Sequence, residues 1–136
     1  MDRIFDGFLI SDNKDLIRID DVCRMLASTY WAGSRPRETI EKSIENSLCF
    51  GVYKDGVQVG FARCVTDYSV LFYLCDVVID SEYRGRGLGQ AIMSAVMEHE
   101  EMKPLVGFLG TRDAHGLYEK FGFARDVEGT FMRRHL

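Results

Sequence analysis

The 136-residue sequence predicts one domain of the α+β class, with a mixed, mainly antiparallel sheet flanked by helices. Two observations predict this class. Strand-like segments follow one another in the middle of the chain with only short turns between them, as antiparallel neighbours do. The second half then alternates strand, helix and strand. A chain of this length leaves room for one domain, so we expect residues 1–136 to form a single unit.

The first part of the chain is predicted to form a short strand followed by two helices. Residues 8–10 are apolar and lead into a polar turn at 11–13. Apolar side chains then recur at helical spacing over 15–28, which indicates a helix. A second helix, 36–47, begins at Pro36, because proline is tolerated in the first helical turn.

The middle of the chain is predicted to be a run of strands. Residues 48–54 and 57–66 flank the Asp-Gly pair at 55–56, which is a strong signal for a two-residue hairpin. After a polar turn at 67–69, residues 70–80 are rich in β-branched and aromatic side chains. These three segments are therefore expected to be strands.

The last part of the chain begins with a change of hydrophobic period. Apolar residues at positions i, i+3, i+4, i+7 and i+8 predict an amphipathic helix over 87–102. We expect a further strand at 104–109, a short helix at 113–121 and a final strand or pair of strands within 123–133.

Composition and charge argue against several classes of protein. The chain has 17 Lys and Arg against 21 Asp and Glu, a net charge of −4, whereas a general nucleic-acid binder needs a basic field. Its apolar runs reach about six residues, against ~20 for a membrane span, and its first residues lack the apolar stretch of a signal peptide. We therefore expect a cytoplasmic protein without nucleic-acid or membrane partners.

The cysteine pattern gives no metal or disulfide signal. The four cysteines lie in apolar contexts without Cys-x-x-Cys spacing, at Cys23, Cys49, Cys64 and Cys75. We expect buried free thiols and no bound metal, as fits a reducing compartment.

The strongest functional signal lies in residues 77–89, where a buried strand leads into a glycine-rich turn that opens a long helix. Glycines let backbone amides approach a ligand, and a helix N-terminus offers unpaired N–H groups and a partial positive charge. These features suit a phosphate or pyrophosphate, and Arg84 and Arg86 add local positive charge. The alternative is a tight connection with two solvated arginines. The dinucleotide fingerprint is absent, because Gln90 stands where its third glycine belongs.

Two motifs in order make a resemblance specific. The string Arg84-x-x-Gly87-x-Gly89 resembles the acyl-CoA pyrophosphate loop of the GNAT superfamily of N-acetyltransferases. Some thirty residues further on, residues 117–123 (Leu-Tyr-Glu-Lys-Phe-Gly-Phe) resemble the second marker of that family. The chain departs from many relatives at Thr111, where they have an asparagine that contacts the cofactor arm.

The resemblance implies a fold, a co-substrate and a set of contacts. In such enzymes a strand splays from its neighbour, and its backbone holds the pantetheine arm and thioester carbonyl of acetyl-CoA; here it would comprise Val77, Val78 and Ile79. The pyrophosphate would be bound by the amides of Arg84, Gly85, Arg86, Gly87, Leu88 and Gly89. Tyr118 stands where the family often has a tyrosine near the CoA sulfur.

The resemblance further implies an enzyme that moves an acetyl group from acetyl-CoA to a primary amine by direct transfer. The alternative is a catalytically silent acyl-CoA-binding sensor or interaction module, and a more remote one is another phosphate-ligand enzyme. The acceptor is expected to be a small-molecule or peptide amine, and the net charge of −4 mildly favours a cationic one. Many relatives are dimers, so a homodimer is one expectation.

Candidate catalytic residues follow from the acid and the base that the reaction needs. Tyr118 is the candidate acid, because a phenol of pKa ~10 stays protonated at neutral pH; the alternative is a core tyrosine. Asp76 is the candidate base, as the only carboxylate within the apolar part of its strand, where burial strengthens a base. Strand alternation could point Asp76 away from the thioester unless the strand carries a bulge, and a water chain could replace it.

The remaining candidates lie outside the motifs. Tyr30 and Trp31 lie between the first two helices, where they would border the acceptor pocket or join the core. Cys75 is expected to pack, and His99 is expected at the surface.

Overall fold

The computed structural model describes all residues, 1–136, and contains one six-stranded sheet in the order β1-β2-β3-β4-β5-β6. Neighbouring strands are antiparallel from β1 to β5, and β6 is parallel to β5. The predicted mixed, mainly antiparallel α+β class is confirmed. The strands are β1 (Asp2–Phe5), β2 (Phe8–Ser11), β3 (Leu48–Lys54), β4 (Val57–Thr66), β5 (Leu71–Ile79) and β6 (Val106–Phe108).

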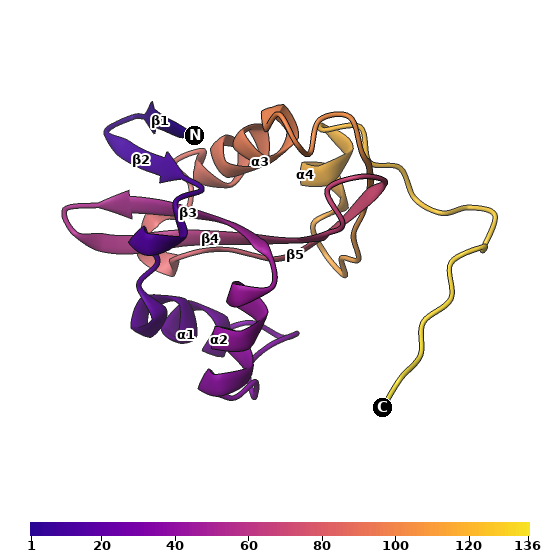
Figure 1. Cartoon of the computed structure of the whole chain (residues 1–136), viewed down its shortest axis with the longest axis horizontal. Helices are drawn as coiled ribbons and strands as arrows, with labels where there is room; N and C mark the ends of the chain where they lie inside the picture. Colours follow the sequence, from indigo (N-terminus) through magenta and orange to yellow (C-terminus); the bar gives the residue numbers. More distant parts are fainter.

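Helices cover both faces of this sheet (Figure 1). On one face lie α1 (Ile19–Ala27) and α2 (Arg37–Glu45), and on the other lie α3 (Leu88–Glu98) and the short α4 (His115–Glu119). Two 3₁₀ turns, η1 (Lys14–Leu16) and η2 (Ser81–Tyr83), precede α1 and α3. None of the helices combines the length and the apolar character that a membrane span requires.

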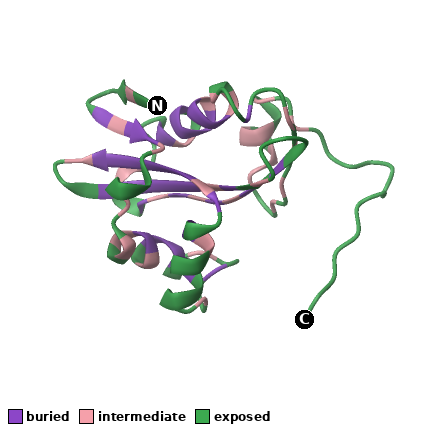
Figure 2. Cartoon of the chain, viewed as in Figure 1, coloured by how far each residue is buried: buried purple, intermediate pink, exposed green.

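Each face has its own apolar core, and Figure 2 shows the buried segments between the layers. The larger cluster joins α3 to the sheet and includes Phe50, Phe72 and Ile92, all fully buried. The smaller joins α1 and α2 to the other face and includes Leu26 and Phe61. Burial of these apolar side chains holds the three layers together.

Turn chemistry explains the hairpins, including one that the sequence analysis missed. Asp55 and Gly56 both have positive φ, 50° and 77°, as the predicted two-residue hairpin requires. Asp6 and Gly7 repeat this geometry with φ of 48° and 81°, and they join β1 to β2. The same Asp-Gly signal at positions 6–7 could therefore have predicted β1.

Helix boundaries differ from the expected ones where the backbone turns out of the helical region. The predicted helix 15–28 begins only at Ile19, because residues 14–16 form η1 and Ile17 is extended with ψ of 128°. Pro36 is the residue before α2, not its first helical residue. Likewise α3 ends at Glu98, since His99 is extended with ψ of 132°.

The predicted C-terminal strand within 123–133 is wrong for this structure. No strand follows α4, and the chain leaves the domain as an extended tail (Figure 1). Val127 and Met132 are 90% and 91% exposed, so their apolar side chains are almost entirely unpacked. This segment pairs with no strand, so it lacks the ladder hydrogen bonds that define one.

Candidate active site

The sheet opens between β5 and β6. Only the first three residues of β5 pair with β6, in the pairs Leu71–Val106, Phe72–Gly107 and Tyr73–Phe108. Beyond Tyr73, β5 continues to Ile79 with no strand on that side. Because strand N–H and C=O groups point alternately to the two sides, this stretch offers unpaired backbone groups to a ligand. The splayed strand implied by the resemblance is therefore present.

A bulge lies within this open part of β5. The pairing with β4 passes from Phe61–Val78 to Arg63–Cys75, so β5 has one residue more than β4 between these pairs. Asp76 sits in the bulge with φ of 55°, a left-handed conformation that is unusual for a residue other than glycine. Such strain persists where the surroundings hold it in place, and it often marks functional sites.

The bulge changes the face to which β5 side chains point. Phe72 and Leu74 pack in the α3 cluster, whereas Val78 packs in the α1 and α2 cluster. Regular alternation would put all three on one face, so the extra residue reverses the pattern between positions 74 and 78. Asp76 is thereby aimed at the loop that joins α1 to α2.

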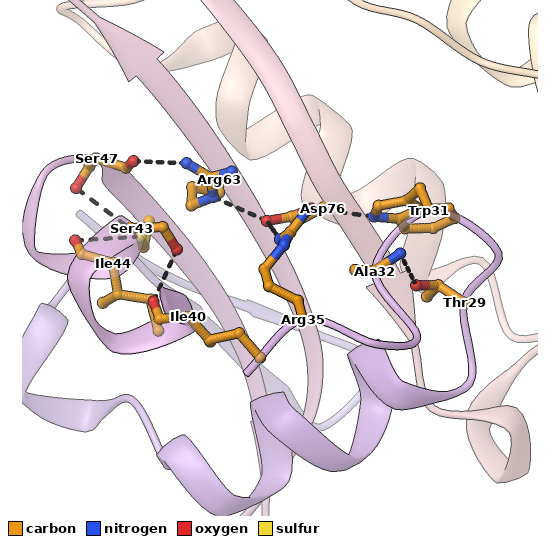
Figure 3. Close-up of polar contacts among 11 residues, drawn as sticks. Thr29, Trp31, Ala32, Arg35, Ile40, Ser43, Ile44, Ser47, Arg63 and Asp76 are labelled. Atoms are coloured by element: carbon orange, nitrogen blue, oxygen red, sulfur yellow. Dashed lines mark hydrogen bonds and ion pairs between the residues drawn. The ribbon is translucent and has the colours of Figure 1, made fainter. Parts of the chain in front are cut away.

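Three donors surround the carboxylate of Asp76, which is buried with 4% of the residue exposed. Trp31 Nε1 donates to Oδ1 over 3.0 Å, and Arg35 Nη1 and Arg63 Nε each donate to Oδ2 over 2.8 Å (Figure 3). Arg63 Nη1 also donates to Ser47 Oγ over 3.1 Å. The apolar surroundings on which the prediction of a base depended are therefore not found, and this network favours a positioning role for Asp76.

The glycine-rich turn begins from an anchored aspartate. Asp80 accepts a hydrogen bond from the Glu82 N–H over 2.9 Å and forms an ion pair with Arg24 of α1. The Glu82 hydrogen bond, assisted by Arg24, lowers the pKa of Asp80 below its ordinary value, so this carboxyl is ionised at neutral pH. The end of β5 is thus tied to the α1 layer at the point where the turn starts.

The turn places open backbone at the start of α3. Gly85 and Gly87 have φ of 78° and 80°, which glycine adopts without strain. Gly87 directly precedes α3 and has no side chain to cap it, so N–H groups of the first turn lack a side-chain partner. A Cβ built on Gly89 meets no atom within 4 Å. The first turn of α3 is therefore open to an anion.

One cavity of about 1340 Å³ joins these features. It exceeds the range of roughly 300–1,000 Å³ typical of small-molecule sites, which leaves room for a long co-substrate and an acceptor. It is lined by nearly all the residues predicted for the site: Tyr30, Trp31, Asp76, Val77, Val78, Ile79, Arg84, Gly85, Gly87, Leu88, Gly89 and Tyr118. Thr111, which replaces the usual asparagine, lines it as well. Arg86 does not; its guanidinium lies over the Tyr83 ring at 5.2 Å.

Tyr118 reaches the cavity from α4. Its ring packs edge-on against Phe123, with ring centroids 6.3 Å apart. Burial, followed by the neighbouring Tyr30 and Asp113, raises the pKa of Tyr118 above its ordinary value. The phenol is therefore protonated at neutral pH, as a proton donor must be.

Two arginines of the network escaped the sequence analysis. Arg35 comes from the loop before α2 and Arg63 from the middle of β4, so no local motif contains both. Arg63 could have been noticed in the sequence, because it is a charged residue within the apolar strand 57–66. Arg35 carried no comparable signal.

Cys75 and His99 both lie in partly buried environments. Cys75 lines the cavity, and burial raises the pKa of its thiol to about 11, which makes it a poor nucleophile at neutral pH. His99 is not the expected surface residue, because its ring bonds Asp12 Oδ2 at 2.8 Å and packs edge-on against Phe50.

Comparison with known proteins identifies the family. The family model for the acetyltransferase (GNAT) domain matches residues 45–125. A crystal structure from Xanthomonas campestris, assigned to the GNAT family of acetyltransferases, is 40% identical and has a TM-score of 0.89. The alignment covers 95% of this chain and 93% of that one. The chain therefore belongs to the GNAT family of acetyltransferases.

More distant relatives agree in family and fold. A Gibberella zeae protein whose name describes an acetyltransferase is 28% identical over 67% of this chain. An uncharacterized N-acetyltransferase from Gracilaria tenuistipitata is 26% identical over 83% of it. The matches span 63% and 65% of these two relatives' own lengths, respectively. A Staphylococcus aureus structure, 22% identical with a TM-score of 0.76, shows the same fold; its alignment covers 95% of this chain and 99% of that one.

Proposed function

We propose that this protein is an N-acetyltransferase that transfers an acetyl group from acetyl-CoA directly to a primary amine. The observation that carries the proposal is one continuous cavity that joins the open first turn of α3, the unpaired edge of β5 and the hydroxyl-bearing ring of Tyr118. An anion site, an extended backbone edge and a proton donor are what a pyrophosphate, an amide-containing arm and a departing thiolate need, in that order.

The residues present fit acetyl-CoA, which supplies the acetyl group as a thioester. The turn from Arg84 to Gly89 would bind the pyrophosphate through backbone amides, and its glycines leave the space that a Cβ would fill. Val77, Val78 and Ile79 would bind the pantetheine arm through the backbone groups that β6 leaves unpaired.

Starting from an ammonium acceptor, the reaction removes two protons from the nitrogen and supplies one to the sulfur, with a net release of one proton. The acceptor nitrogen forms a bond to the acetyl carbon as the carbon–sulfur bond breaks, with Tyr118 Oη donating a proton to the sulfur. The acceptor ammonium first loses one proton to water in the open cavity. The nitrogen loses its second proton as the amide forms, and a proton from water restores the phenol of Tyr118. Asp76, whose two oxygens already accept three hydrogen bonds, holds the acceptor side of the cavity in place.

Thiol release tests this function. Purified protein is mixed with acetyl-CoA and a panel of amines, and free CoA thiol is measured with and without each amine. An enzyme releases thiol only when an acceptor amine is present. Tight acetyl-CoA binding without release for any amine would instead show a silent acyl-CoA-binding module, and no binding at all would refute the site assignment.

A further inference from the structure

The acceptor side of the cavity is rich in arginine, although the chain as a whole is acidic. Arg35, Arg63 and Arg112 line it, from the α1–α2 loop, β4 and the loop after β6. Asp76 and Asp113 are the only acidic residues in the cavity lining, which includes no lysine and no glutamate. The local charge is therefore opposite in sign to the net charge of −4.

The cluster around Asp76 has more positive than negative charge. Two guanidinium groups bind one carboxylate, which leaves one positive charge uncompensated. Arg63 is the deeper of the two and also uses Nη1 on Ser47. Arg35, whose side chain is 23% exposed, uses only Nη1, so its other N–H donors are free to meet a ligand (Figure 3).

Arg112 adds a second uncompensated charge at the same end of the cavity. Its guanidinium lies 3.8 Å from the centroid of the Tyr30 ring, and its backbone N–H donates to the Tyr30 hydroxyl over 3.0 Å. No carboxylate is paired with it. Tyr30 in turn packs edge-on against Trp31, which binds Asp76. The aromatic pair thus connects the two arginine positions.

These charges do not face the pyrophosphate site. Asp76 precedes Asp80, where the glycine-rich turn starts, by four residues of extended chain, which is about 13 Å. Arg84 already provides a guanidinium at that end, where its Nε donates to the Ile79 carbonyl over 3.2 Å. An anionic group bound by Arg35 at the bulge would therefore belong to the acceptor.

From this geometry, and on the basis of the proposed acetyl transfer, we infer that the acceptor is a primary amine that also carries an anionic group, a carboxylate or a phosphate. Arg35 binds that anionic group with its free N–H donors. Arg112, on the Tyr30 side of the Tyr30–Trp31 pair, adds a second positive charge nearby. A guanidinium suits both anions because its planar fork can bind two oxygens at once. Charges inside a cavity act at short range and are screened less than the surface charge that would attract a cationic amine.

Matched amine pairs test the inference. Acetyl-CoA turnover is compared for β-alanine against β-alaninamide, and for phosphoethanolamine against ethanolamine. We expect kcat/KM at least tenfold higher for the anionic member of one or both pairs. The pair with the larger ratio distinguishes carboxylate from phosphate.

Substitutions then test whether Arg35 and Arg112 cause the preference for anionic amines. In Arg35→Gln and Arg112→Gln, KM for the anionic amine should rise at least tenfold, while KM for acetyl-CoA and for the neutral amine stays within about twofold. Arg35→Lys should recover part of the loss, because it restores the charge without the planar fork. Arg37→Gln is the matched control, two residues further on and outside the cavity lining, and it should leave every constant unchanged.

The outcomes separate the two proposals. Equal or better turnover of the neutral amines, or an anionic preference that survives in both glutamine variants, overturns the inference and leaves the acetyltransferase function standing. Absence of thiol release with every amine removes the proposed function and the inference with it. Should Arg35→Gln fail to fold, Arg112→Gln decides, since Arg112 is exposed and has no salt-bridge partner.

Discussion

Trp31 donates its indole N–H to the carboxylate of Asp76 over 3.0 Å, although 45 residues separate them in the chain. This bond ties the loop between α1 and α2 to the bulge of β5, at the place where the sheet opens. Backbone strain at a left-handed aspartate needs such external contacts to persist. The loop and the bulge therefore support each other, and the shape of the cavity that Trp31 and Asp76 line depends on both.

Trp31→Phe tests this connection, because it keeps an aromatic ring and removes only the donor. A hydrogen bond to a charged group contributes about 1.5–3 kcal/mol, and Asp76 keeps two arginine partners. We expect the free energy of unfolding, measured by urea denaturation, to fall by about 1.5 kcal/mol. Tyr68→Phe, which alters an exposed tyrosine outside the cavity, should leave it unchanged. Equal stability of Trp31→Phe and the parent would show that the bond is dispensable.

Gly89→Val tests the anion site without disturbing the fold. The position has open space around a Cβ and a φ outside the left-handed region, so valine fits, but its side chain occupies the space next to the first-turn amides. We expect the Kd for acetyl-CoA, measured by calorimetry, to rise at least tenfold. Gln90→Val places the same side chain in the same helical turn outside the cavity lining, and it should bind like the parent. Unchanged affinity in Gly89→Val would place the pyrophosphate elsewhere.

Tyr118→Phe tests the proton donor. The substitution retains the ring that packs on Phe123, so acetyl-CoA affinity should change little, while kcat falls by about one order of magnitude or more. Because burial raises the pKa of Tyr118, the phenol stays protonated beyond the pH at which an ordinary tyrosine ionises, and kcat of the parent should not decline at or below that pH. A pH–rate profile of both proteins measures this. Parental kcat in Tyr118→Phe, with chemistry rate-limiting, would remove the acid role.

The residues proposed to bind acetyl-CoA carry local sequence signals, whereas long-range contacts form the rest of the cavity. The glycine-rich turn and α4 each lie within a short segment, so their residues could be recognised together from the sequence. The arginine network could not, because Arg35 and Arg63 meet Asp76 from other elements. Their meeting also needs the bulge, since a single extra residue reverses which face a strand's side chains point to.

The C-terminal region shows a different limit of sequence reasoning. The sequence predicts a strand within 123–133, but this segment pairs with no strand of the sheet, so it has none of the ladder hydrogen bonds that define a strand. The outer edge of β6 carries no further strand, and Val106 there is 60% exposed, while the tail leaves the domain. An unpaired strand edge and exposed apolar side chains, such as those of Val127 and Met132, are both features through which two copies of a chain can associate.

The unpaired outer edge of β6, which includes the exposed Val106, is a candidate contact for the expected homodimer. Val106→Lys should weaken association, because lysine on an exposed strand edge opposes pairing with another chain. We expect light scattering to give the mass of two chains for the parent and of one chain for Val106→Lys at low micromolar concentration. Val57→Lys, at the exposed start of β4, is the control and should remain a dimer. A parent that is monomeric at every concentration would contradict the expectation.

Asp76→Asn decides between a base and a positioning residue. Asparagine has nearly the same shape but no charge, so Arg35 and Arg63 would face each other without their shared counter-ion. Removing one partner of a buried ion pair costs about 3–5 kcal/mol, and a large fall in the urea midpoint is expected. If Asp76 only positions the cavity, the variant should lose kcat through misplacement while the acidic limb of its pH–rate profile stays at the parental pH. A limb that moves in Asp76→Asn would identify the carboxylate as the group that removes the acceptor's proton. Acetyl-CoA affinity should stay close to the parental value in either case, because the turn proposed to bind the pyrophosphate starts at Arg84, eight residues after Asp76.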